Sequence, residues 1–600
     1  MFQSFEVVSS PETGPKRLEL LRAELRAEGL DGFLVPRADA HQGEYVADCD
    51  ARLSWLTGFT GSAGFAAILA ETAGVFIDGR YRSQVKSQVD LEHFTPVHWP
   101  EIKLGNWLIE ALPKGGTVGY DRWLHTRREI EELADLLDES GINLQPCANL
   151  VDRIWQDRPA KPSGKIDPHP IEFSGEIHTD KAARLAVILK QSGDNSAILT
   201  LPDSICWLLN IRGNDVSHNP VVQSFAILNC DASCDFFVER SKAQQLQAHL
   251  GDQVRLHDIS EFEAALHQLK GQVRLDPDTA PDMVAAILEQ SGVRLRFAAD
   301  PCILPKACKN QVEITGARNA HLRDAVAMVQ LLCWLDQAAP KGQLSEIDVV
   351  TKLEKLRRQT GKLRDISFET ISGSGPNGAI IHYRVNKDSN RTISSGEMLL
   401  IDSGGQYQDG TTDITRTIAV GRVGIEEKTC FTRVLQGMVA ISRARFPNGL
   451  TGRDLDPLAR YPLWLAGLDY NHGTGHGVGS YLSVHEGPQR ISRATDVALQ
   501  TGMILSNEPG YYREGAFGIR IENLIVVENA PALSGADKRD MLSFETLTHV
   551  PIDRRLIVTK MLSEGERNWV NAYHAKTLEM LSPHLDEITR KWLNVACATL

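Results

Sequence analysis

The sequence predicts a mixed α/β (α+β) protein of three domains, in which two similar domains precede a larger one. Two observations lead to this fold class. A series of helix and strand signals near the start of the chain recurs further along, and the last part of the chain repeats a pattern in which an apolar strand ends in a carboxylate. Segments without periodicity separate these parts, so we place the domains at residues 1–156, 157–306 and 307–600.

The first domain begins with an amphipathic helix that is followed by strands. Leu18, Leu21 and Leu25 recur at the spacing that places side chains on one face of a helix. Four short apolar segments come next, and three strands are expected among them: GFLVP (32–36), SWLTGF (54–59), FAAILA (65–70) and VFIDG (75–79).

The second domain repeats this order loosely. Leu185, Ile188 and Leu189 open it at helical spacing. Four apolar segments follow them: AILTLP (197–202), CWLLNIRG (206–213), FAILN (225–229) and FFVE (236–239). Two tandem α/β domains of similar topology explain the repeat, and a chance similarity between two α/β units is the alternative.

Two breaks separate the three domains. The segment DRPAKPSGKIDPHP (157–170) reads as a linker, because its repeated prolines favour an extended backbone. The segment DPCILPKACKN (300–310) marks the second break. Residues 311–339 then follow a helical pattern, with Val326 and Val329 on its apolar stripe, and open the third domain.

Composition excludes several classes of protein. The net charge of −13, from 64 Lys and Arg against 77 Asp and Glu, argues against a nucleic-acid-binding protein, because such proteins usually carry a basic stripe. The apolar runs are far shorter than the roughly 20 residues of a membrane span, and the N-terminus lacks the features of a secretory signal. Ten scattered cysteines indicate free thiols in a reducing compartment. We therefore expect a cytoplasmic protein with no nucleic-acid or membrane partner.

The third domain carries a duplicated pattern of carboxylates. In the first copy, a buried-strand run ends at Asp402, and Asp413 begins an alternating stretch after a glycine-rich turn. The second copy repeats this plan with Glu508 and Glu522. Because alternate residues of a strand share a face, each half presents two carboxylates. A pseudo-twofold arrangement of the halves would bring all four into one centre.

Such a centre needs positive charge. Four carboxylates cannot share a buried site unpaired, because like charges would push most of them to protonate. Two divalent cations balance four carboxylates, and oxygen ligands with limited imidazole suit Mn²⁺. The glycine-rich stretch HGTGHGVGSYLSVHEGP (472–488) offers a histidine donor from His472, His476 or His485.

These motifs resemble those of the pita-bread metallopeptidases (family M24). The four carboxylates and His476 are similar to the five-ligand dinuclear metal site of that family. DAHQGEY (39–45) and residues 207–213 also match its three-domain type. The resemblance implies two tandem creatinase/prolidase N-terminal-like α/β domains followed by a pita-bread catalytic domain. Six longer segments are similar to the cytosolic, three-domain Xaa-Pro aminopeptidases: ISGSGPNGAIIHY (371–383), LIDSGGQYQDGTTDITRT (400–417), HGTGHGVG (472–479), VHEGP (484–488), NEPGYY (507–512) and GIRIEN (518–523).

The resemblance also implies roles for single residues. The implied metal ligands are Asp402, Asp413, His476, Glu508 and Glu522. The implied catalytic residues are Glu508, which would accept and donate a proton, His382 and His485. The implied substrate-binding residues are His382, His472 and His485. Two arginines are added to them from their place in the sequence. Arg520 lies two residues before Glu522 on the same strand face, where it would hold a carboxylate, and Arg80, in GRYR (79–82), could reach a neighbouring site.

The implied reaction releases the N-terminal residue from peptides with proline at the second position. Water between two metal ions becomes hydroxide near neutral pH, and this bridging hydroxide would attack the scissile carbonyl. The centre keeps a residual negative charge that suits an N-terminal ammonium group, which favours an exopeptidase. We expect two divalent ions per chain, with Mn²⁺ preferred and Zn²⁺ or Co²⁺ as alternatives. The resemblance further implies a homodimer.

Three other functions are weighed against this one. A prolidase restricted to Xaa-Pro dipeptides would use the same chemistry, and activity on a tripeptide separates the two. A non-catalytic pita-bread peptide-binding protein and a metal-free creatinase-like hydrolase are disfavoured, because all five ligand residue types are present.

Overall fold

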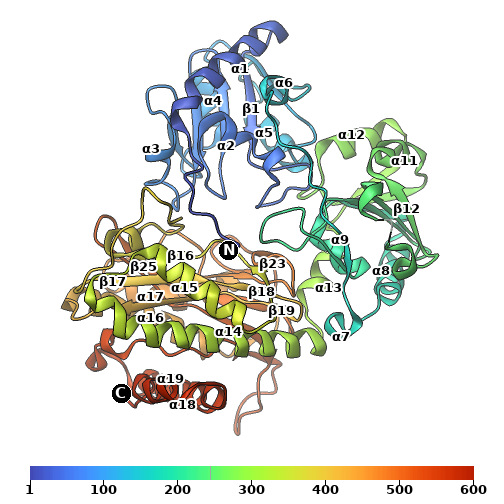
Figure 1. Cartoon of the computed structure of the whole chain (residues 1–600). Helices are drawn as coiled ribbons and strands as arrows, with labels where there is room; N and C mark the ends of the chain where they lie inside the picture. The colour runs from blue at the N-terminus through green and yellow to red at the C-terminus, as the bar shows by residue number, and fades with distance from the viewer. Residues whose placement is uncertain (244) are drawn as a thin grey trace. The chain divides into compact units, whose positions relative to one another are not determined.

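The computed structural model describes residues 1–243 and 245–600, and these residues form two compact units (Figure 1). Unit 1 contains Met1–Val7 and Leu304–Leu600, and unit 2 contains Val8–Ile303. The boundary between the units falls inside the second break expected from the sequence, at residues 300–310.

Unit 2 contains two six-stranded sheets of the same topology. The strand orders are β4-β3-β2-β1-β5-β6 and β12-β11-β10-β8-β13-β14. In the first sheet, β1 pairs with β2 antiparallel and with β5 parallel; in the second, β8 pairs with β10 antiparallel and with β13 parallel. The predicted internal repeat is confirmed. The strands are β1 (Gly32–Pro36), β2 (Phe65–Leu69), β3 (Ala73–Ile77), β4 (Thr95–His98), β5 (Gly116–Tyr120), β6 (Ile142–Pro146), β8 (Ser196–Leu199), β10 (Phe225–Asn229), β11 (Cys234–Val238), β12 (Val254–Asp258), β13 (Gln272–Leu275) and β14 (Arg294–Phe297).

Equivalent helices precede the two sheets. Helix α1 (Gly14–Glu28) buries its predicted leucine stripe and ends at Gly29, which has a φ of 67°. Helix α8 (His178–Ser192) ends in the same way at Gly193, with a φ of 73°. Both glycines adopt the left-handed conformation that ends many helices, because a glycine has no Cβ to clash there.

The structure shows which of the apolar segments are strands. The segment SWLTGF belongs to helix α2 (Arg52–Thr57), and the first part of CWLLNIRG belongs to helix α9 (Pro202–Leu209). Leu53 and Leu56 are both buried and three residues apart, so the segment buries a helical stripe rather than one face of a strand. Three strands remain in the first set, and the second set contains β8, β10, β11 and the two-residue strand β9 (Ile211–Arg212).

The helix predicted at residues 311–339 is confirmed, and the segment predicted as a linker carries little secondary structure. Residues 157–170 contain only the two-residue strand β7 (Asp167–Pro168). Helix α14 (Gln311–Ala338) is capped by Asn310, which accepts from the third residue of the helix while Glu313 reaches back to the cap. Among the described residues, no helix is both long and apolar enough to cross a membrane. All ten cysteines are free thiols.

The described residues of unit 1 form four sheets. Two of them have the orders β16-β17-β20 and β21-β28-β27-β24-β22-β23. The third has the order β15-β18-β19, from β15 (Leu363–Ile366), β18 (Gly405–Tyr407) and β19 (Gly410–Thr411), and the fourth is the pair β25-β26. Helix α14 and strand β17 contribute to the same apolar cluster, which includes Met328, Leu332, Leu399 and Ile401. Helices α14 to α17 lie across these strands in Figure 1. The elements are α15 (Glu346–Gln359), β16 (Ile371–Ser374), β17 (Met398–Ser403), β20 (Ile414–Ala419), α16 (Ile425–Ser442), β21 (Phe446–Pro447), α17 (Gly452–Trp464), β22 (Gly475–Gly477), β23 (Glu486–Ile491), β24 (Ile504–Asn507), β25 (Gly510–Arg513), β26 (Phe517–Arg520), β27 (Asn523–Asn529), β28 (Met541–Thr546), α18 (Glu564–Leu581) and α19 (Glu587–Ala596).

The first residues of the chain belong to unit 1 as well. Gln3 Nε2 donates to the Thr370 carbonyl at 3.2 Å, and the Thr370 N–H donates to Gln3 Oε1 at 2.8 Å. Phe5 packs against an apolar cluster that contains Tyr383. This N-terminal segment therefore supports the part of unit 1 that carries His382.

Candidate metal centre

The first half of unit 1 places two carboxylates at the end of a strand pair. Strands β17 and β20 are antiparallel, with Asp402 opposite Thr415 and Ser403 opposite Ile414. Asp413 directly precedes β20, so it lies at the same end of the pair as Asp402. Both aspartates are buried.

The second half places two glutamates in the same way. Strands β24 and β27 are antiparallel, with Asn507 opposite Asn523. Glu508 follows β24 and Glu522 precedes β27, so both lie at one end of this pair. The Glu522 N–H donates to the Thr415 carbonyl at 3.1 Å, and Thr415 Oγ1 donates to Glu522 Oε2 at 2.8 Å. These bonds join the two halves directly.

His476 lies on β22, beside β24, and its ring meets both halves. Its Nε2 is 3.5 Å from Asp413 Oδ2 and 3.5 Å from Glu508 Oε1. One donor atom from each of Asp413, His476 and Glu522 falls within 4.8 Å of the others. A Cβ on Gly475 would lie 2.0 Å from the Ser506 carbonyl oxygen, so only glycine permits this approach of β22 to β24.

The electrostatics of the cluster call for a cation. Burial raises the pKa of Asp413 well above its usual range, and the carboxylates of Asp402 and Glu508 raise it further. Burial also raises the pKa of Glu522, with added repulsion from Asp413. Asp402 Oδ1, Asp413 Oδ1 and Glu522 Oε1 are buried and accept no hydrogen bond from any described residue. Such oxygens are costly unless a proton or a cation satisfies them. The donor set of four carboxylates and one imidazole therefore fits divalent metal ions.

Arg520 supports one of the carboxylates from outside the cluster. Its side chain is only 2% exposed, and its Nη2 is 2.6 Å from Asp402 Oδ2. Its Nε donates to Thr415 Oγ1 at 3.1 Å, and its Nη1 donates to the Tyr512 hydroxyl at 2.6 Å. The same hydroxyl lies 3.0 Å from His472 Nε2. A continuous chain of hydrogen bonds thus connects His472 with Asp402.

The structure brings most of the predicted site residues together. The rings of His476 and His485 meet edge to face, with centroids 4.3 Å apart. His382 follows Ile381, whose carbonyl lies 3.4 Å from Arg520 Nη2.

Arg80 belongs to unit 2. It follows β3, and its Nη2 is 2.6 Å from Asp78 Oδ2.

Three further residues support the site, although the sequence did not single them out. Thr415 lies on the strand face that Asp413 begins, and this shared face was the available signal. Ser506 accepts the His476 N–H at 2.9 Å and donates to Glu508 Oε1 at 3.2 Å; its signal is a polar residue inside an apolar strand. Tyr512 carries no such signal, because its contact with Arg520 arises from the β25–β26 pairing.

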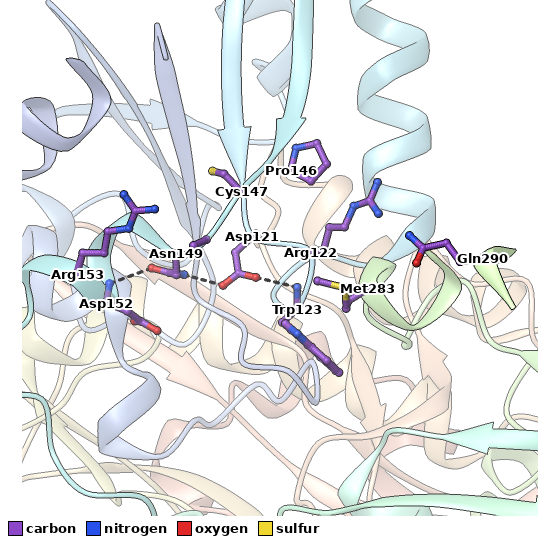
Figure 2. Close-up of a pocket in the computed structure, with 11 residues that line it drawn as sticks. Asp121, Arg122, Trp123, Pro146, Cys147, Asn149, Asp152, Arg153, Met283 and Gln290 are labelled. Carbon is purple, nitrogen blue, oxygen red and sulfur yellow. Dashed lines mark hydrogen bonds between the residues drawn. The ribbon is translucent and has the colours of Figure 1, made fainter. Parts of the chain in front are cut away.

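A pocket in unit 2 has a volume of about 700 Å³, and Figure 2 shows residues that line it. Asp121 accepts hydrogen bonds from the Trp123 N–H at 2.9 Å and from Asn149 Nδ2 at 3.1 Å. Asn149 Oδ1 in turn accepts from the Asp152 N–H at 3.1 Å. Because these polar groups satisfy one another, and none of the predicted site residues lines the pocket, we assign it no role.

Comparison with protein families identifies the class of this chain. Residues 315–529 match the model of metallopeptidase family M24, and residues 540–600 match the C-terminal region of that peptidase. Residues 17–154 and 157–313 match two models of the creatinase/prolidase N-terminal domain. The chain belongs to metallopeptidase family M24. The predicted fold, two creatinase-like domains followed by a pita-bread catalytic domain, is confirmed.

The relatives of this chain within the family are described as aminopeptidases that act at proline. "Probable Xaa-Pro aminopeptidase P" of Talaromyces marneffei is 40% identical over 605 residues, which cover 96% of this chain and 91% of that protein. "Aminopeptidase P2" of Arabidopsis thaliana is 38% identical over 612 residues, which cover 94% and 85%. The solved structure of X-prolyl aminopeptidase from Caenorhabditis elegans, described as a cytosolic enzyme with a di-nuclear active site, has a TM-score of 0.93 and 34% identity, covering 98% of this chain and 100% of that one.

Proposed function

We propose that this chain is a metal-dependent aminopeptidase that releases the N-terminal residue from peptides with proline at the second position. The observation that carries the proposal is the buried cluster of four carboxylates beside His476, in which three oxygens lack a protein donor. Similarity to Xaa-Pro aminopeptidases along nearly the whole chain gives the substrate class. An Xaa-Pro bond has no N–H on its proline nitrogen, so the site must recognise the ring and the N-terminal ammonium instead.

The cofactor of this proposal is a pair of divalent ions, with Mn²⁺ preferred. Asp402, Asp413, His476, Glu508 and Glu522 would hold them. Donor atoms of Asp413, His476 and Glu522 lie within 4.8 Å of one another, Glu508 Oε1 lies 3.5 Å from His476 Nε2, and the Asp402 carboxylate is near enough to raise the pKa of Asp413, which supports this assignment. When bound, such ions provide Lewis acidity and a nucleophile derived from water near neutral pH.

Proton transfer is assigned to Glu508. Its side chain is 18% exposed, whereas that of Asp413 is 5% exposed, so water and substrate reach Glu508 more readily. Its carboxylate would take a proton from the attacking water and pass one to the leaving nitrogen. His485 and His382 would donate hydrogen bonds to the scissile carbonyl, where negative charge develops.

Three further residues were expected to bind the substrate: His472, Arg80 and Arg520. His472 and Arg80 stay proposed substrate-binding residues. The burial of Arg520 and its bond to Asp402 favour a role in orienting that ligand rather than direct contact with the peptide.

We also propose the domain limits 1–156, 157–306 and 307–600, and a cytoplasmic location. The family matches end at residues 154 and 313, and the compact units divide after Ile303, which supports limits close to these. The cytosolic description of the Caenorhabditis elegans enzyme and the ten free thiols support the location.

We propose a homodimer in which a second copy covers an apolar face formed by α17 and the residue that follows it, Leu465. Four large side chains are exposed there, at 42%, 58%, 41% and 71%: Leu458, Tyr461, Trp464 and Leu465. Such a patch is typical of an interaction surface. Light scattering should give twice the 66.3 kDa of one chain. Trp464→Glu with Leu465→Glu should give a monomer, whereas Ile588→Glu, at an exposed apolar residue of α19, should not. A wild-type monomer would contradict the dimer.

The experiment that tests the function compares two peptides. We expect the purified chain, supplied with Mn²⁺, to release arginine from Arg-Pro-Pro, as measured by mass spectrometry of the products. Metal analysis should find up to two divalent ions per chain, and a chelator should abolish the activity until metal is restored. Cleavage of Gly-Pro alone would instead indicate a prolidase. A chain that contains no metal and works equally well with chelator would refute the metal centre.

A further inference from the structure

A buried carboxylate, that of Glu346, accepts hydrogen bonds from several parts of the loop that carries His382. Residues 374–391, called the His382 loop below, begin at the end of β16 and lead towards β17. Glu346 is the first residue of α15 and is 0% exposed. Its carboxylate lies inside this loop rather than in the metal centre.

Glu346 accepts hydrogen bonds from the start, the middle and the end of the His382 loop. At the start, the Ser374 N–H donates to Oε1 at 2.7 Å, and Asn377 Nδ2 donates to Oε2 at 3.0 Å. In the middle, the Tyr383 hydroxyl donates to Oε2 at 2.8 Å. At the end, the Arg391 N–H donates to Oε2 at 3.4 Å. Hydrogen bonds to an ionised acceptor are stronger than bonds between neutral groups, so one carboxylate holds the whole loop.

His382 lies between two anchored neighbours. Tyr383 is buried, and besides its bond to Glu346 it packs in an apolar cluster. On the other side, the Ile381 carbonyl accepts a hydrogen bond from Arg520, the residue that holds Asp402. His382 itself is half-buried. Its main chain therefore cannot shift without breaking the bond to Glu346 or the bond to Arg520.

We propose that Glu346 is a positioning residue for His382, acting through the Tyr383 hydroxyl and the start of the loop. The inference rests on the proposed function, in which His382 donates a hydrogen bond to the scissile carbonyl. A displacement of about 1 Å in a catalytic group can cost about 100-fold in rate, so a rigid support for this loop has a direct kinetic value. The groups bonded to the Glu346 carboxylate, which include the Ser374 hydroxyl at 3.1 Å, are all donors, which explains why a carboxylate and not an amide stands here.

Two variants test this support. Tyr383→Phe removes one hydroxyl and keeps the ring, and we expect it to lower kcat on Arg-Pro-Pro about 10-fold. Glu346→Gln turns an NH₂ group towards groups that are themselves donors, and it should lower kcat about 100-fold. Metal content should stay at the wild-type level in both. Tyr120→Phe is the matched control, because the buried Tyr120 hydroxyl in unit 2 also donates to a buried carboxylate, that of Asp282, at 3.1 Å; its kcat should equal that of the wild type.

A double-mutant cycle with His382→Ala separates positioning from general damage. If Tyr383 acts through His382, then adding Tyr383→Phe to His382→Ala should lower kcat no further. The proposal would be overturned if Tyr383→Phe lowered kcat equally in the wild type and in His382→Ala. It would also be overturned if Tyr383→Phe alone kept the wild-type kcat or lost metal. The cycle decides the question even if Glu346→Gln does not fold. A wild-type chain that fails to cleave Arg-Pro-Pro would instead refute the proposed function, which is a different result.

Discussion

Asp413→Ala and His476→Ala are each expected to abolish turnover of an Xaa-Pro peptide, with kcat reduced about 1,000-fold or more. Loss of an outer partner of a metal ligand already costs about 10–100-fold, and these two residues are proposed to be ligands themselves. Asp413 Oδ2 lies 3.5 Å from His476 Nε2, at the point where the two halves of unit 1 meet. Without either residue, the remaining side chains form an incomplete set of donors for the metal ions.

The measurement combines kinetics with metal analysis. Both variants should lose bound metal along with activity, while circular dichroism should stay that of the wild type. Asp409→Ala is a suitable control, because Asp409 lies in the same unit and pairs with Arg323 outside the cluster. Full activity in either ligand variant would show that the assignment of ligands is wrong.

His485→Ala is expected to lower kcat about 100-fold to 1,000-fold, the cost of removing one donor to a developing oxyanion. The His485 ring contacts the His476 ring edge to face, so it borders the centre without belonging to the cluster of donor atoms formed by Asp413, His476 and Glu522. Metal content should therefore remain unchanged.

Steady-state kinetics and metal analysis of His485→Ala distinguish two roles. A low kcat with full metal content supports a group that contacts the substrate. A loss of metal would make His485 a ligand, and an unchanged kcat would remove it from the mechanism. His267→Ala, at an exposed histidine of unit 2, provides the matched control.

The positions of the carboxylates were predictable because each ends or begins a strand. Apolar runs and two-residue alternation are local signals, and the pattern around Asp402 and Asp413 recurs around Glu508 and Glu522. The same local signals do not assign SWLTGF, because a six-residue apolar segment suits a strand or a buried helix equally well. Its tertiary neighbours, which bury Leu53 and Leu56 together, decide for the helix.

Of the supporting network, only the contact of Arg520 with a carboxylate was predictable in this way, because Arg520 lies two residues before Glu522 and so on the same strand face. Tyr512, Arg520 and His472 meet only after β25 and β26 pair and the glycine-rich stretch folds against them. Glu346 reaches Tyr383 across 37 residues, and no periodicity links the two. Contacts of this kind depend on the folded arrangement, and a single sequence carries no local pattern for them.

The hydrogen bond between Thr415 and Glu522 has a consequence for the order of folding, because the metal centre forms only after these two residues meet. It spans 107 residues, so the chain must fold both halves of unit 1 before the carboxylates come together. Long-range closures of this kind are slow steps in folding, and neither half alone offers more than two of the four carboxylates. Metal binding should therefore follow folding and stabilise the finished domain, instead of guiding the chain to its fold.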